Sequence, residues 1–254
     1  MKCKTIFIFD CDGTILNSFD SSQEILKRLA KQYKISLPNS NDLSFKKIWG
    51  KGGYNLIKRY FPKENPEIVH REWKKLESNI ATNLIDGAET TIKNLKKRGF
   101  IVGLLTNRAW KSLKQYSGLI KNLNFDFIQT SEYKKRDRII TKLNPFKKHL
   151  TTSHPKPDSK CFNPFFKWMK RKKIKPKKNF YIGDCLGDFD AVINANFYYG
   201  YNIEFISVLT GPIKTRKNWY KITKTNKRIF ILSSISALIK WLDDKKGDEK
   251  NHLL

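Results

Sequence analysis

Two aspartates near the start of the chain offer the clearest chemistry in the sequence. Asp10 and Asp12 are separated by one residue, and Gly13 and Thr14 follow them directly. Residues two apart in an extended chain point to the same side, so both carboxylates can face one site, and Gly13 then permits a sharp turn. This arrangement suits a nucleophile beside a proton donor, although an Asp-rich turn that caps a strand uses the same residue types.

A second acidic pair lies far along the chain. Asp184 and Asp188 belong to the segment Gly183-Asp184-Cys185-Leu186-Gly187-Asp188, which follows a short apolar run. Carboxylate oxygens are the preferred ligands of hard cations, and acids are scarce in this chain, with 23 Asp and Glu against 51 Lys and Arg. The pair therefore indicates a divalent-cation site, with a solvated acidic turn as the plainer alternative.

Polar and cationic residues stand at two points between the acidic pairs. Thr106 and Asn107 follow an apolar run, where a hydroxyl and backbone N–H groups can hold phosphate oxygens. Lys156 lies between Pro155 and Pro157, whose rings stiffen the backbone around it. Each feature alone is weak, because Thr-Asn is a common turn and lysine is abundant. Their order along the chain gives them weight.

These residues must be positioned by a regular scaffold. Short, nearly continuous apolar runs are typical of strands that are buried on both faces. Amphipathic helical stretches lie between most of them, so the alternation predicts an α/β fold with a doubly wound parallel sheet, whose strand carboxyl ends form the ligand crevice. The runs are Thr5–Phe9, Phe100–Leu105, Phe125–Gln129, Asn179–Ile182, Phe205–Leu209 and Arg228–Leu232. The helical stretches are Thr90–Arg98, Cys161–Lys173 and Ser233–Leu242.

One segment breaks this alternation. Residues 18–86 contain no strand-like run and predict helices over Ser21–Tyr33, Ser44–Trp49, Tyr54–Tyr60 and Pro66–Thr82. We therefore expect a core domain of residues 1–16 and 87–254 and an inserted helical domain of residues 17–86. Short connections near Asn17 and Gly87 are candidate hinges that would let the insertion close over Asp10.

Taken in order, the motifs resemble those of the haloacid dehalogenase superfamily of phosphohydrolases. The matching residues are Asp10-x-Asp12-Gly13-Thr14, Thr106, Lys156 and Gly183-Asp184-x-x-x-Asp188. The helical insertion, the Asn17-Ser18 pair and Gly50 are similar to the phosphoglycolate phosphatase-like branch. The resemblance implies a Rossmann-like core with an α-helical cap domain.

The resemblance also implies catalytic roles. Asp10 would attack phosphorus and become an aspartyl-phosphate, and Asp12 would act as general acid and then general base. Thr106 and the backbone of Asn107 would bind the transferring phosphoryl group, and Lys156 would neutralise its charge. Dehalogenases of the superfamily lack an acid at the position of Asp12, so dehalogenation is disfavoured.

The same resemblance implies a metal, and the glycines of Lys51-Gly52-Gly53-Tyr54 make that stretch a candidate substrate contact in the cap. The implied cofactor is Mg²⁺, held by Asp10, the carbonyl of Asp12, Asp184 and Asp188. In the cap, Lys51 and Gly52 are expected to approach the substrate.

The net charge of +28 is extreme and attracts polyanions and small anions, although compositional bias of the source genome explains a lysine excess equally well. The long stretch 131–153 leaves a strand carboxyl end, so its cations are expected on the catalytic side. Residues 167–178 lead into a strand and are expected on the far side, as a solvated face or a nonspecific anion patch. The cations of the first stretch are Lys134, Lys135, Arg136, Arg138, Lys142, Lys147 and Lys148.

Composition limits the function classes. The chain has 254 residues, of which 39% are hydrophobic, and no apolar run approaches the roughly 20 residues of a membrane span. We expect a cytoplasmic Mg²⁺-dependent phosphatase acting on a small phosphomonoester of the phosphoglycolate or sugar-phosphate type. The alternatives are a phosphatase acting on nucleic-acid 3′ or 5′ ends, a sugar-phosphate mutase, and a non-enzymatic nucleic-acid-binding protein on the same scaffold.

Overall fold

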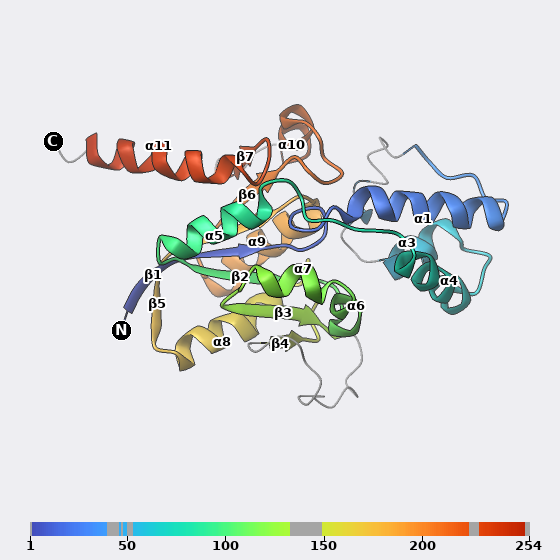
Figure 1. The fold of residues 1–254 in the computed structure, drawn as a ribbon, viewed down its shortest axis with the longest axis horizontal. Helices are drawn as coiled ribbons and strands as arrows, with labels where there is room; N and C mark the ends of the chain where they lie inside the picture. Colours follow the sequence, from blue (N-terminus) through green and yellow to red (C-terminus); the bar gives the residue numbers. More distant parts are fainter. Residues whose placement is uncertain are drawn as a thin grey trace.

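The computed structural model describes residues 2–39, 46, 48–49, 53–132, 149–223 and 229–251 (Figure 1). The predicted cap contacts Lys51 and Gly52 lie outside these residues, as do the basic cluster Lys134–Lys148 and half of the predicted helix Ser44–Trp49.

A seven-stranded parallel sheet forms the core, in the order β4-β3-β2-β1-β5-β6-β7. From β1 the chain builds one half of the sheet outward to β4, and then returns to β5 and builds the other half. The strand order therefore reverses between β1 and β5, which is where ligands bind in open α/β sheets. The strands are β1 (Lys2–Phe9), β2 (Ile101–Leu105), β3 (Phe127–Ser131), β4 (His149–Thr152), β5 (Ile174–Gly183), β6 (Ile203–Val208) and β7 (Ile229–Leu232).

The doubly wound sheet predicted from the sequence is confirmed, with one additional strand. Strand β4 pairs with β3 at the edge of the sheet, within a stretch that the sequence had indicated only as a long basic link. Its sequence, His-Leu-Thr-Thr, contains no apolar run, because an edge strand of this length buries little surface. Strand β5 also begins earlier than predicted, since its first residues are alternately exposed and lysine-rich.

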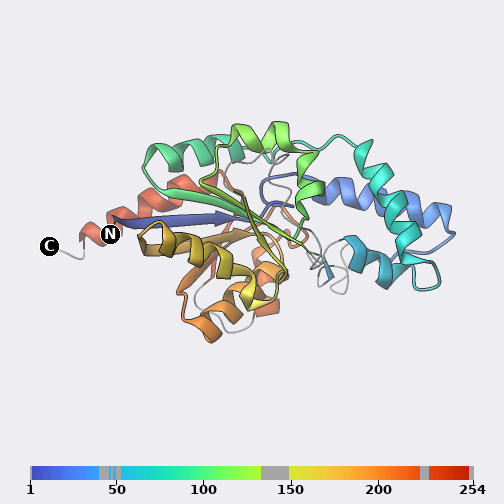
Figure 2. The same ribbon diagram turned by 90° about the horizontal axis from the view of Figure 1, so that it is seen from below.

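Helices cover both faces of the sheet. Figure 2 shows the green helices α5 and α7 above the sheet and the gold and orange helices α8 and α9 below it. Alternate residues of β1 contact the helices on opposite faces of the sheet. Phe7 and Phe9 pack against the layer of α5, α7 and α11, whereas Ile6 and Ile8 pack against the layer of α8, α9 and α10. The helices of the first layer are α5 (Ala88–Lys97), α6 (Trp110–Lys114), α7 (Ser117–Asn122) and α11 (Ala237–Asn251). Those of the second are η2 (Ser159–Phe162), α8 (Asn163–Arg171), α9 (Leu186–Tyr199) and α10 (Arg216–Thr223).

The segment between β1 and α5 is helical, as predicted, and lies beyond the carboxyl ends of the strands (Figure 1). Its helices α1 (Ser18–Gln32), α3 (Gly53–Tyr60) and α4 (Pro66–Ser78) enclose an apolar core of their own. The chain enters and leaves this segment through two adjacent antiparallel connections, because Asn17 N donates to Asn83 O at 2.9 Å and Ile85 N donates to Ile15 O at 2.8 Å. None of the described helices is long and apolar enough to cross a membrane.

The close packing of β2 against β3 generates a stability prediction. A Cβ atom at Gly103 would overlap the ring of Phe127, whereas a Cβ at Gly118 in α7 would meet no atom within 4 Å. We expect Gly103→Ala to lower the free energy of unfolding by about 1–3 kcal/mol, because overpacking forces the ring off its rotamer. The matched control Gly118→Ala should leave stability unchanged or raise it by up to about 1 kcal/mol. Urea unfolding measures both, and equal stabilities would contradict this packing.

Candidate active site

The carboxyl edge of the sheet brings together residues from all the predicted motifs. Asp10 follows β1, Thr106 follows β2 and Asp184 follows β5, so they approach from neighbouring strands. Lys156 comes from the loop between β4 and η2, and Asp188 from the first turn of α9. All of these side chains are buried.

Lys156 is the centre of a buried hydrogen-bond network. Its Nζ donates to Asp10 Oδ1 at 2.5 Å, to Asp188 Oδ1 at 2.6 Å and to the Tyr181 hydroxyl oxygen at 2.8 Å. These contacts use the three protons of the ammonium. The other oxygen of Asp10, Oδ2, makes no hydrogen bond with the described residues. Lys156 therefore fixes the orientation of Asp10 while leaving one carboxylate oxygen available for chemistry.

Asn107 holds Lys156 in place. Its Oδ1 accepts from the backbone N of Lys156 at 2.7 Å, and its Nδ2 donates to the backbone O of Lys156 at 3.0 Å. The sequence placed only the backbone of Asn107 in the site, as a phosphate ligand, and did not anticipate this clamp. Thr106 is buried beside it, and its hydroxyl oxygen accepts from the backbone N of Arg108 at 3.1 Å.

Asp188 uses both carboxylate oxygens within the protein. Oδ1 accepts from Lys156 and from the Tyr181 hydroxyl, and Oδ2 accepts from the backbone N–H groups of Asp184 and Cys185 at 3.2 and 3.3 Å. The carboxylate therefore ties the amino end of α9 to Lys156. No sequence signal identified Tyr181, because it reads as one of the apolar residues of its strand.

Asp184 differs from Asp188 in that one of its carboxylate oxygens has no hydrogen-bond partner. Its Oδ1 accepts from the Thr14 hydroxyl at 3.2 Å, but its Oδ2 is buried without any hydrogen-bond partner. A Cβ atom at Gly13 or Gly211 would collide with that oxygen, so only glycines allow the carboxylate to lie there. An unsatisfied buried carboxylate oxygen is costly, and a divalent cation would compensate it.

The raised pKa values of the buried acids also favour a bound cation at this site. Burial, with help from Asp188, raises the pKa of Asp10 to about 7, against the opposing effect of Lys156. Burial followed by Asp188 and Asp10 raises the pKa of Asp184 well above its ordinary value. The carboxylates of Asp10, Asp184 and Asp188 thus share a single ammonium. Ligand atoms of Asp184, Cys185 and Asp188 lie within 4.8 Å of one another, and among the described residues this is the group that could hold a metal.

Asp12 lies apart from this acidic group because Arg108 holds it. The Arg108 Nε lies 3.0 and 2.9 Å from the two carboxylate oxygens of Asp12, and Nη2 lies 2.8 Å from Oδ1. Burial alone would raise the pKa of Asp12, but the guanidinium outweighs it and lowers the pKa below its ordinary value. Sequence reasoning did not identify Arg108, although it follows Thr106-Asn107 directly.

Arg108 also connects the sheet to the helical segment. Its Nη1 lies 2.8 Å from Oε1 of Glu77 in α4, and Lys74 Nζ lies 2.6 Å from the other oxygen of Glu77. The Arg108 guanidinium additionally lies over the Tyr116 ring, 4.9 Å from its centroid. Arg108 thus joins the acid beside Asp10 to a helix of the insertion.

Comparisons with known proteins identify the family of this chain. The family model described as haloacid dehalogenase-like hydrolase matches residues 7–199. No curated protein sequence matches the chain.

Solved structures share the fold at low sequence identity. A haloacid dehalogenase-like family hydrolase from Streptococcus pneumoniae superposes with a TM-score of 0.63 and 12% identity, covering 95% of this chain and 100% of its own. A predicted phosphoglycolate phosphatase from Haemophilus somnus gives a TM-score of 0.61 and 17% identity, covering 95% of this chain and 99% of its own. A protein described as a beta-phosphoglucomutase from Bacteroides vulgatus gives 0.62 and 16%, covering 95% and 88%.

The buried ion network generates a stability prediction. We expect Lys156→Met to lower the free energy of unfolding by about 3–5 kcal/mol, because it leaves the carboxylates of Asp10 and Asp188 buried without their cation. The exposed Lys160→Met is the matched control and should change stability by less than about 0.5 kcal/mol. Adding Asp188→Asn to Lys156→Met should recover part of the stability in a double-mutant cycle. Full additivity of the two substitutions in urea unfolding would contradict the direct contact.

Proposed function

The chain belongs to the haloacid dehalogenase-like hydrolase family, and we propose that it is a Mg²⁺-dependent phosphatase that forms an aspartyl-phosphate on Asp10. The observation that carries this proposal is the orientation of Asp10: Lys156 holds one carboxylate oxygen at 2.5 Å, and the other is available. A carboxylate fixed in this way is suited to attack a phosphoryl group.

The surrounding residues support a phosphoryl-binding role. We place the phosphoryl oxygens near the Lys156 ammonium and the Thr106 hydroxyl, which lie at the same edge of the sheet as Asp10. Preorganised cationic and hydroxyl donors stabilise the charge that develops during transfer, and their burial strengthens the effect. Asn107 contributes by fixing the backbone of Lys156.

The buried Asp184 oxygen that lacks a partner fits a Mg²⁺ ion. Asp10, the backbone carbonyl of Asp12 and Asp184 would hold it, and Asp188 would act through its contacts with Lys156 and Asp184. When bound, Mg²⁺ would supply positive charge to the phosphoryl oxygens and allow the carboxylates of Asp10 and Asp184 to remain ionised together.

We assign general acid–base catalysis to Asp12. Its carboxylate would protonate the leaving oxygen and later take a proton from the attacking water. In the present structure Arg108 lowers the pKa of Asp12 and therefore favours the ionised form. The ion pair with Arg108 has to loosen before Asp12 can donate a proton, so this contact describes a resting arrangement.

We propose that residues 17–86 form a cap that covers a small substrate. The helices lie beyond the catalytic edge, and Glu77 of α4 contacts Arg108, so a charged contact next to Asp12 joins them to the sheet. Closure of these helices over Asp10 would exclude bulk water. We assign this site a small phosphomonoester such as phosphoglycolate or a sugar phosphate, in line with the protein described as a predicted phosphoglycolate phosphatase among the similar folds.

A sugar-phosphate mutase is the second candidate, motivated by the similar fold of the protein described as a beta-phosphoglucomutase. It would use the same aspartyl-phosphate but protect it from water. Phosphate release from sugar phosphates separates the two: a phosphatase liberates inorganic phosphate at each turnover, whereas a mutase converts one sugar phosphate into another.

The covalent mechanism predicts that Asp10→Asn abolishes activity. With the nucleophile replaced by an amide, kcat on a phosphomonoester should fall by at least about 10³-fold in the presence of Mg²⁺. The matched control is Asp20→Asn, an exposed acid in α1, which should retain near wild-type kcat. Phosphate release assays test this, and substantial turnover by the Asp10 variant would exclude the mechanism.

The environments of Asp184 and Asp12 predict that the first acid serves metal binding and the second serves acid–base catalysis. Asp184→Asn should weaken Mg²⁺ binding at least about tenfold in isothermal titration, because its buried carboxylate is expected to be a direct ligand. Asp12→Asn should leave Mg²⁺ affinity within about threefold, since its side chain contacts Arg108, yet slow kcat by about 10²–10⁴-fold. An equal drop in Mg²⁺ affinity in both variants would refute the assignment of the ligands.

A further inference from the structure

A second concave surface lies along the edge of the sheet, separate from the Asp10 site. Strand β4 and helix α8 line a groove of about 700 Å³ that extends from His154 to Arg171. We call it the β4–α8 groove. Its cationic side chains are Lys160, Lys167, Lys170 and Arg171, and none of its lining residues is acidic.

The cations of the groove share one side of a continuous helical stretch. Lys160 lies in η2, and Lys167, Lys170 and Arg171 follow in α8 at intervals that keep them on one face. All of them are exposed, and no carboxylate of the described residues lies within 4 Å of their charged atoms. Asp158, which lies in the loop between His154 and Lys160, accepts from His154 and from the backbone N of Lys160. The groove therefore carries uncompensated positive charge.

Aromatic side chains lie directly beside the groove. Phe166 of α8 stacks on Tyr201 with ring centroids 3.7 Å apart, and Tyr201 stacks on Tyr199 with centroids 5.3 Å apart. The Tyr201 hydroxyl donates to Oδ1 of Asn163, a residue of the groove wall, at 2.7 Å. Beyond them Phe197 is 81% exposed and Tyr198 is 67% exposed. We call Phe197, Tyr198, Tyr199 and Tyr201 the aromatic shelf.

We propose that the β4–α8 groove and the aromatic shelf form a binding site for single-stranded nucleic acid. The cations of α8 contact the phosphates of the backbone, and the exposed rings of the shelf stack with bases. This pairing of a positive groove with stacking surfaces is how single strands are bound without sequence preference.

The length of the groove suits a ligand of a few nucleotides, because a helix of nine residues such as α8 is about 13 Å long. An acidic peptide would satisfy the cations but would gain nothing from the exposed rings, so the shelf favours nucleic acid. The site is independent of the proposed phosphatase activity.

Fluorescence anisotropy of a labelled 12-nucleotide oligothymidylate with the full chain, titrated at several salt concentrations, tests the proposal. The groove variant is Lys160→Gln with Lys167→Gln, Lys170→Gln and Arg171→Gln. We expect its Kd to rise at least about tenfold. Its salt dependence should also fall, by about 0.7 in log–log slope for each phosphate that the variant no longer neutralises.

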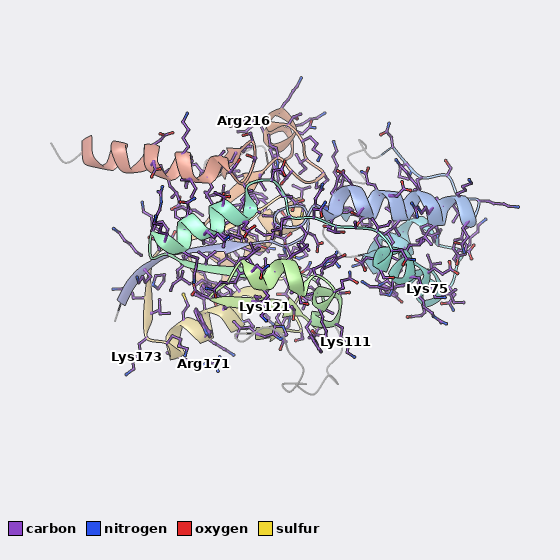
Figure 3. The ribbon with its side chains drawn as sticks, viewed as in Figure 1. Lys75, Lys111, Lys121, Arg171, Lys173 and Arg216 are labelled. Atoms are coloured by element: carbon purple, nitrogen blue, oxygen red, sulfur yellow. The ribbon has the colours of Figure 1, made fainter. Side chains whose placement is uncertain are left out.

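The matched control removes the same charge elsewhere, with Lys27→Gln, Lys97→Gln, Lys121→Gln and Lys240→Gln. These lysines are exposed and lie outside the groove. Figure 3 labels Lys121 on α7 and Arg171 at the end of α8, and Figure 2 shows these two helices on opposite faces of the sheet. The control variant should bind within about threefold of wild type. Equal weakening in both variants would show that net charge alone attracts the oligonucleotide and would overturn the proposal.

The shelf is tested by Phe197→Ala with Tyr198→Ala. We expect Kd for the oligonucleotide to rise at least about fivefold with an unchanged salt slope, because the variant cannot stack on bases but still binds the phosphates. Binding of poly-glutamate should be unaffected by this variant. An unchanged oligonucleotide Kd would contradict the nucleic-acid assignment and indicate a general polyanion site, and thermal unfolding of every variant confirms that the fold is retained.

Discussion

The candidate active site depends on one electrostatic constraint: three buried carboxylates at the edge of the sheet have a single ammonium group, that of Lys156, among them. Asp10, Asp184 and Asp188 converge where β1 and β5 end, and Lys156 contacts only two of them. Burial, followed by the like charges of the neighbouring carboxylates, raises the pKa of Asp10 and of Asp184. The hydrogen bonds of Asn107, Tyr181 and Thr14 hold this group together, and the partnerless oxygen of Asp184 marks the position at which a cation would balance it.

A second charged network isolates Asp12 from that group. Arg108 pairs with Asp12 and Glu77, so the same guanidinium sets the protonation of the proposed general acid and holds α4 near the sheet. In this account, opening of the helical segment and release of Asp12 are coupled events, since both require the contacts of Arg108 to change. In this proposal the coupling links the helical segment chemically, and not only sterically, to the acid that we assign to proton transfer.

The sequence predicted the features that leave a local pattern. Apolar runs located every strand except β4, whose polar four-residue sequence lacks that pattern, and the spacing of acids identified Asp10, Asp12, Asp184 and Asp188. It did not identify Arg108, Glu77 or Tyr181, because their importance comes from partners far away in the chain: Arg108 is 96 residues from Asp12 and Tyr181 is 25 residues from Lys156. The same limit explains why residues 167–178 suggested only a far-side basic face, since the groove appears once β4 is placed beside α8.

The most direct test of the central claim is to trap the phosphorylated enzyme. Wild-type protein turning over p-nitrophenyl phosphate with Mg²⁺ is quenched in acid, treated with borohydride and digested, because borohydride reduces an aspartyl-phosphate to homoserine. The account predicts homoserine at position 10 in the peptide that contains Cys11 and Asp12, and its absence when substrate is omitted. Continued phosphate release with Asp10 unmodified, or homoserine at another aspartate, would contradict it.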